Sequence, residues 1–149
     1  MNRYVVMVLV AGLLLGAAPA PKEDEAKKDA EQLQGKWVFA SLDVDGKVDA
    51  PEDKKGVTLV IEKDEFTLRD GDDVIIKGKF KLDPAHKPKA IDIQVTEGNR
   101  KGKAMLGIYH LDKDSLKWSA AEPGDKNRPA EFTTKAGAKY VTFTFKKKK

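Results

Sequence analysis

The chain has 149 residues, enough for one domain, and 35% of them are charged while only 7% are aromatic, which limits the size of the core. The formal net charge is +4, arginine is scarce and acidic residues stand between the lysines, so no specific nucleic-acid-binding surface is expected. The absence of cysteine excludes disulfides, thiolate metal sites, a cysteine nucleophile and a cysteine-linked lipid anchor.

Residues 1–21 have the pattern of a signal peptide. Arg3 precedes an apolar run over residues 4–18, and Ala18-Pro19-Ala20 has the small-x-small form of a cleavage site. Cleavage after Ala18 or Ala20 would place a proline first in the mature chain, which signal peptidases handle badly, so a cut after Ala17 is an alternative. The signal-peptide pattern predicts export to the periplasm or the exterior, without a transmembrane segment after cleavage. The alternative is an uncleaved N-terminal anchor.

Residues 22–30 are expected to be a charged linker. Residues 31–149 are expected to form a β-domain, and a short helical segment leads into it. Period-2 alternation predicts the first strand at residues 37–44, with Trp37 and Phe39 on one face and Val38, Leu42 and Val44 on the other. Further strands are predicted at residues 57–62, 66–68, 74–82, 90–96, 104–111, 116–120, 131–134 and 140–145, the last two forming a hairpin.

Turn signals separate these strands. Asp45-Gly46 turns the chain after the first strand, and Asp70-Gly71 predicts a type I′ hairpin turn. Short, evenly spaced strands are typical of an antiparallel up-and-down barrel or a sandwich, and we expect a barrel of eight or nine strands. Residues 61–68 and 111–118 share one pattern around a Lys-Asp tip. They are therefore interpreted either as equivalent hairpins on opposite sides of the barrel or as two merely similar turns.

Gly35-Lys36-Trp37, at the first strand of an all-β domain, resembles the Gly-x-Trp opening of lipocalins and their calycin relatives. The chain also resembles a family of uncharacterised domains in exported planctomycete proteins. Its hallmark segments correspond here to residues 33–37, 43–47, 78–84, 106–112 and 128–132. The resemblance covers residues 30–146 and implies export and a lipocalin-like barrel, but no activity. Lipocalins place a basic residue of the last strand over the tryptophan, and Lys146 is the nearest candidate here.

The sequence contains no recognisable catalytic or phosphate-binding motif. His86 is expected in an exposed loop, and His110 on the strand face opposite Tyr109, so neither suggests a metal site. Glu131 stands in an apolar context and is expected to pair with Arg128 or to brace the barrel end. We expect no enzyme activity, no cofactor and no metal.

Aromatic residues stand on the apolar phases of the predicted strands. They either fill the core or line a small, partly open cavity, since an eight-stranded barrel is near the size at which both occur. The candidate ligand-binding residues are Trp37, Phe39, Phe80, Tyr109 and Trp118. The candidate structural residues of the barrel end are Gly35, Trp37, Arg128 and Glu131.

Two functions remain open from the sequence. The first is a monomeric, non-catalytic exported barrel that binds a small apolar or amphipathic ligand, or a partner protein. The second is a structural module with a solid barrel, whose lysine tail at residues 146–149 contacts anionic cell-envelope polymers.

Overall fold

The computed structural model describes residues 21–50 and 52–149, and the side chains from residue 24 onward. Within these residues one α-helix, α1 (Pro21–Leu33), precedes nine strands, and a single 3-10 turn, η1 (Glu52–Lys54), follows the second strand. The strands are β1 (Gly35–Val44), β2 (Lys47–Asp49), β3 (Val57–Glu62), β4 (Glu65–Asp70), β5 (Asp73–Asp83), β6 (Ala90–Gly98), β7 (Ala104–Asp112), β8 (Ser115–Ala121) and β9 (Tyr140–Lys147).

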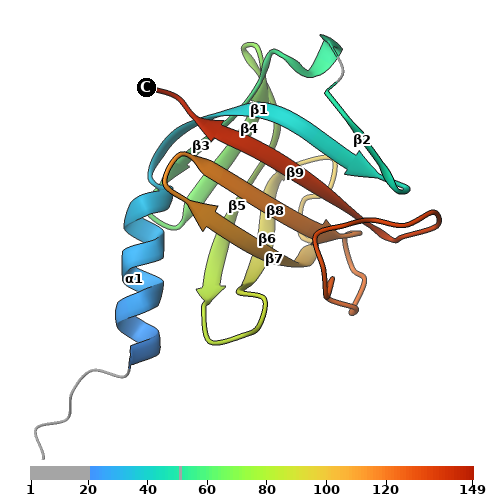
Figure 1. Ribbon diagram of the computed structural model, residues 1–149. Helices are drawn as coiled ribbons and strands as arrows, with labels where there is room; N and C mark the ends of the chain where they lie inside the picture. The colour runs from blue at the N-terminus through green and yellow to red at the C-terminus, as the bar shows by residue number, and fades with distance from the viewer. Residues whose placement is uncertain (1–20, 51) are drawn as a thin grey trace, which may run out of the picture.

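Eight of these strands form a closed antiparallel barrel (Figure 1). The order around it is β1, β3, β4, β5, β6, β7, β8 and β9, and β9 pairs with β1 to close the ring. The short strand β2 lies outside the ring and pairs only with the end of β1. Closure removes free sheet edges from the ring. The predicted all-β, up-and-down, lipocalin-like barrel is confirmed.

Side-chain alternation separates the barrel interior from its surface. In β6, Ile91, Ile93 and Val95 are buried, while Asp92 and Gln94 between them are exposed. One hydrophobic core joins buried residues of seven barrel strands with Leu33 of α1, and partly buried side chains of β5 pack against it. Burying this apolar surface is the main favourable term for a domain without disulfides.

A bulge in β1 changes which of its side chains face inward. Phe39 pairs with Phe145, but the register shifts at Ala40, and Leu42 then pairs with Phe143. A bulge inserts one residue and so reverses the alternation beyond it. Leu42 therefore lies on the inner face with Phe39, and its predicted place on the opposite face was wrong.

The two expected turns both form, but Asp70-Gly71 does not have the predicted type I′ conformation. The turn between β1 and β2 has positive φ at both Asp45 (51°) and Gly46 (80°), as a type I′ turn requires. The turn between β4 and β5 has a positive φ only at Gly71 (59°), since Asp72 does not share it. Type I′ geometry thus belongs to Asp45-Gly46 rather than to Asp70-Gly71.

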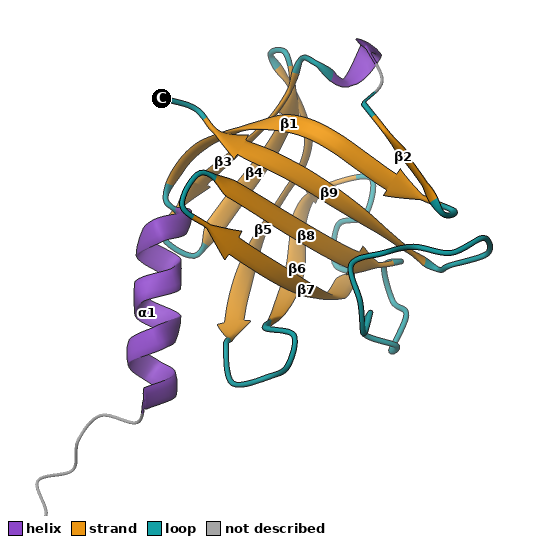
Figure 2. Cartoon of the chain, in the orientation of Figure 1, coloured by secondary structure: helices purple, strands orange, loops and turns teal. Residues whose placement is uncertain are grey.

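The barrel has two distinct ends (Figure 2). At the closed end, α1 joins β1 beside the β3–β4 and β7–β8 turns, and Leu33 enters the core. At the open end lie the β1–β2, β4–β5 and β6–β7 turns. The closed end holds most of the contacts between α1 and the barrel, and the open end holds the interior cavity described below.

Residues 122–139 form a long loop over the outside of the barrel instead of a strand. The Thr142 hydroxyl donates a hydrogen bond to the Phe132 carbonyl (2.6 Å) and accepts one from the Ser119 hydroxyl (3.0 Å), and both Thr142 and Ser119 are buried. The Thr134 hydroxyl donates to the Asp43 carboxylate. The predicted strand at residues 131–134 and its hairpin with β9 are wrong, because β9 pairs with β8 and β1 on its two sides.

The repeated pattern at residues 61–68 and 111–118 marks two hairpins that each have a two-residue turn. The first joins β3 to β4 and the second joins β7 to β8, four strands further around the ring. The Asp64 carbonyl accepts a hydrogen bond from the Phe80 amide, and the Asp114 carbonyl accepts one from the Lys147 amide, both at 2.9 Å. The expected spacing of four strands around the ring is confirmed, but the two turns differ in conformation, because Lys63 has φ = 55° whereas Lys113 has no positive φ.

The N-terminal expectations have mixed outcomes. Apart from Pro21, the expected signal peptide lies outside the described residues. Residues 22–30, expected as a linker, belong to α1, and Asp29 is buried against the barrel. Among the described residues, no helix is long and apolar enough to cross a membrane.

Candidate functional site

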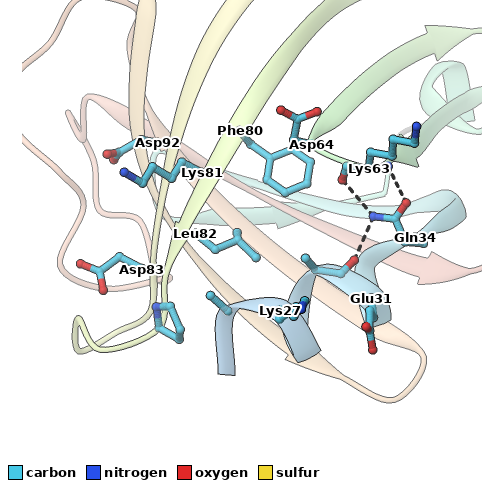
Figure 3. A pocket seen from close by; sticks show the side chains of 13 residues that line it. Lys27, Glu31, Gln34, Lys63, Asp64, Phe80, Lys81, Leu82, Asp83 and Asp92 are labelled. Atoms are coloured by element: carbon cyan, nitrogen blue, oxygen red, sulfur yellow. Dashed lines mark hydrogen bonds between the residues drawn. The ribbon is translucent and has the colours of Figure 1, made fainter. Parts of the chain in front are cut away.

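Two sizeable hollows occur among the described residues. The larger, of about 920 Å³, is an open groove between α1, the β3–β4 turn and β5 (Figure 3). Four carboxylates and three lysines contribute to its lining. Gln34 spans one side of this groove, because its amide accepts from the Lys63 N–H (2.6 Å) and donates to the Lys63 and Ala30 carbonyls.

The second hollow is a cavity of about 390 Å³ inside the open half of the barrel. Its lining is mostly apolar, and the described residues that form it include no carboxylate. The lining residues are Phe39, Leu42, Lys54, Val57, Phe66, Leu68, Ile75, Ile76, Asn99, Arg100, Met105, Trp118, Ala120, Phe143 and Phe145. Binding sites for small molecules are typically concave, mostly apolar and several hundred Å³ in volume, so this cavity is the candidate site.

Aromatic rings form the wall and floor of the cavity. Phe39 meets Phe145 edge to face (6.4 Å between centroids), and Phe143 stacks on Phe145 (6.0 Å). Phe66 and Trp118 meet edge to face at 5.3 Å and 90°. Such pairs hold the rings in fixed positions, so the cavity is pre-formed by the packing of its own walls.

The floor separates the cavity from the closed end. Below Trp118 a void of only about 10 Å³ remains, between Leu33, Phe80, Tyr109 and Leu116 among others. That volume is about enough for one water molecule. The closed half of the barrel is therefore filled, while the open half is not.

One polar atom at the floor has no partner. Trp118 Nε1 is buried and makes no hydrogen bond with the described residues. A buried indole N–H usually finds an acceptor, and leaving one unpaired carries a desolvation cost.

The five predicted ligand-binding residues divide between these regions. Phe39 and Trp118 line the cavity. Trp37 and Tyr109 are buried at the closed end, at 0% and 1% exposure, and do not line it. Phe80 faces the small void and the outer groove instead of the cavity, because β5 carries it to the α1 side of the barrel (Figure 3). The cavity residues Met105 and Phe143 were missed because their patterns were those of ordinary core positions.

Trp37 is fixed at the closed end by a hydrogen bond at the edge of its ring and a cation over the ring. Its Nε1 donates to the Leu33 carbonyl (2.8 Å) at the end of α1. Lys147 Nζ lies 5.0 Å from the ring centroid and donates to the Gln32 and Gln34 carbonyls. The basic residue over the tryptophan is thus Lys147 and not Lys146, which is exposed, because the β1–β9 register places Lys147 opposite Trp37.

A buried polar network that the sequence analysis missed ties α1 to the barrel. The Tyr109 hydroxyl donates to Asp29 Oδ2 (2.7 Å), and Lys89 Nζ donates to the same oxygen (2.8 Å) and pairs with Glu25 (3.0 Å). Burial, and then the hydrogen bond to Asp29, raise the pKa of Tyr109 well above its usual range. Burial opposes the charge on Lys89, but its two carboxylate partners outweigh that effect and raise its pKa.

The other predicted barrel-end residues have different roles. Gly35 adopts φ = 114°, which only glycine takes without strain, at the α1–β1 junction. Arg128 pairs with Asp92 (2.6 Å) and donates to the Gly107 carbonyl (2.8 Å), so it anchors the long loop to β6 and β7. Glu131 is exposed and lies 3.9 Å from Lys135, so the expected Arg128–Glu131 pair does not form.

Both histidines are exposed, and His110 contacts Phe132 of the long loop. The described residues hold no group of three or more His, Asp or Glu side chains placed to bind a metal ion. Comparisons with family models, with curated proteins and with solved structures found no match to this chain. The candidate function therefore rests on the geometry of the cavity.

Proposed function

We propose that this protein is an exported, non-catalytic barrel that binds a small apolar or amphipathic ligand in its open half. The observation that carries the proposal is the cavity of about 390 Å³, mostly apolar and with no lining carboxylate among the described residues. Export rests on the pattern of residues 1–21, and the resemblance to the planctomycete domain family agrees with it.

The physical reason for binding is the transfer of apolar surface from water. Each methylene that a ligand buries contributes about 0.8 kcal/mol. The rigid aromatic walls lower the entropic cost of binding, because they are already ordered without ligand. The affinity for straight-chain alcohols should therefore rise with each added methylene and then level off when the chain fills the cavity.

A series of straight-chain alcohols tests this with the mature protein. We expect saturable changes in Trp118 fluorescence and a rise in melting temperature, because the ligand binds the native state alone. Ala120→Leu places a larger side chain in the cavity and should weaken binding. Lys79→Leu, which adds the same side chain on the exposed face of β5, should leave binding unchanged. Absence of saturable binding by every alcohol would refute the proposal.

A second candidate, contact with anionic cell-envelope polymers, is favoured by one observation at the closed end. The Lys148 amide donates to the Lys36 carbonyl (2.9 Å), and Lys36, Lys146 and Lys148 are all exposed. Lysines fixed side by side on paired strands repel each other, and a polyanion would relieve that repulsion. Lys147 is not part of this surface because it binds Trp37 and α1.

A triple variant, Lys36→Gln with Lys146→Gln and Lys148→Gln, tests the second candidate without disturbing Lys147. If the surface binds a polyanion such as heparin, the variant should lose binding and keep its melting temperature. Wild-type binding should fall steeply as salt rises, since charges are screened over about 8 Å at physiological ionic strength. Binding that is insensitive to salt would exclude this function.

A further inference from the structure

The charged residues that line the cavity, Lys54 and Arg100, are both cations. Lys54 comes from η1 and Arg100 from the β6–β7 turn, so two separate connections at the open end bring them to the same opening. Asn99, beside Arg100, is the other polar residue of the lining, and the remaining lining residues are aliphatic or aromatic. The opening therefore presents positive charge above an apolar interior.

Lys54 and Arg100 form no salt bridge that would stabilise the fold among the described residues. Both are exposed, and neither takes part in an ion pair within the part of the chain that the structure describes. The contrast with Lys55 is informative, since that lysine pairs with Glu52 at 2.6 Å. The outer groove differs as well, because its lysines are interspersed with Glu31, Asp64, Asp83 and Asp92.

The lip of the cavity is also apolar on one side. Ile75 lines the cavity and is 43% exposed, and its neighbour Val74 is 42% exposed. Exposed apolar side chains at an opening let an alkyl chain leave water gradually as it enters. A chain in the cavity would then end at the opening, where its head group meets Lys54 and Arg100.

We infer that the ligand is an anionic amphiphile, an alkyl chain that carries a carboxylate or a similar acidic head group. This inference rests on the proposed function and adds the chemistry of the head group. The chain fills the open half of the barrel, and the head group remains at the mouth between Lys54 and Arg100. The head group keeps much of its hydration there, so the ion pairs are made without the cost of burying a charge.

Dodecanoate and dodecanol form a matched pair of probes, because they share the chain and differ in the charge of the head group at about pH 7.4. Isothermal titration of the mature protein should give about tenfold tighter binding for dodecanoate, as expected for two partly exposed ion pairs. Raising the salt concentration should weaken dodecanoate binding and leave dodecanol binding unchanged.

Lys54→Ala combined with Arg100→Ala should remove this tenfold preference without changing the affinity for dodecanol. Lys55→Ala combined with Lys101→Ala is the matched control. It removes the same charge from the neighbouring positions, which do not line the cavity, and should keep the preference.

The outcomes separate the inference from the function on which it rests. Equal affinities for the two probes, or a preference that survives the Lys54/Arg100 double variant, would overturn the anionic head group and leave the apolar cavity as proposed. Failure of both probes to bind would overturn the proposed function together with the inference.

Discussion

The residues that join α1 to β1 have separate physical tasks at the closed end of the barrel. Leu33 enters the core, Gln34 bridges to the β3–β4 turn, Gly35 takes a positive φ and Trp37 plugs the interior. The last carbonyls of a helix lack intrahelical partners. Here Trp37, Gln34 and Lys147 donate to several of them, so this short segment fixes both the helix and the barrel.

Replacing Trp37 by alanine should lower the free energy of unfolding by about 3–5 kcal/mol, as large-to-small changes in a core do. The indole is 0% exposed and belongs to the hydrophobic core. Trp37→Phe keeps most of the apolar surface, loses the hydrogen bond to the Leu33 carbonyl, and should cost less. Urea unfolding measures both, and a loss under about 1 kcal/mol for Trp37→Ala would contradict its structural role.

Tyr109→Phe tests the polar network through pH. It removes the hydrogen bond to the buried Asp29 carboxylate and should cost about 1.5–3 kcal/mol near neutral pH. The pKa of Tyr109 is raised by folding, so its stabilising contribution is complete below the unfolded value of 10.0 and is lost as pH rises above it.

Between about pH 9 and pH 11 the wild type should therefore lose stability more steeply than Tyr109→Phe, by about 1.4 kcal/mol per pH unit above the unfolded pKa. Lys89 has a raised pKa as well and contributes a loss of the same sign in both proteins. Urea unfolding across this range provides the measurement. Parallel curves for the two proteins would mean that Tyr109 does not hold its proton more tightly in the folded state.

At the scale of elements, the sequence predicted the barrel strands well where one face of the strand is buried and the other is exposed to solvent. The prediction for β3 was correct at both ends, and those for β5 to β8 differ by one or two residues. Three features were missed for identifiable reasons. The bulge in β1 leaves no periodic signal, the long loop contains a short apolar stretch that resembles a strand, and the charged residues of α1 conceal one buried carboxylate.

The link between β9 and α1 gives a prediction with a built-in control. Lys147→Ala should lower the free energy of unfolding by about 1–3 kcal/mol, because it removes the hydrogen bonds to the Gln32 carbonyl of α1 and the Gln34 carbonyl just after it, and the contact with the Trp37 ring. Lys146→Ala, one residue earlier and exposed, should change it by less than about 0.5 kcal/mol. Thermal or urea unfolding measures the stability of both variants. Equal losses of stability would contradict the role of Lys147 as the basic partner of Trp37.

The whole molecule is a barrel that is filled at one end and hollow at the other. Below Trp118 the interior retains about 10 Å³ of void, whereas above it about 390 Å³ remain. The sequence indicated the aromatic residues that point inward, but not how they divide between the two halves. That division depends on side-chain volumes summed over eight strands and on the bulge that turns Leu42 inward, which no single strand reveals.

Methyl-resolved NMR during a dodecanol titration tests most directly whether the hollow half is a binding site. We predict saturable shifts at cavity methyl groups such as Leu42, Leu68, Ile76 and Met105, with Leu33 at the filled end little changed. Shifts centred on Ala30 and Leu82 would assign binding to the outer groove, and the absence of any saturable shift would show that the cavity takes no apolar ligand. Either result would contradict a ligand-binding barrel interior.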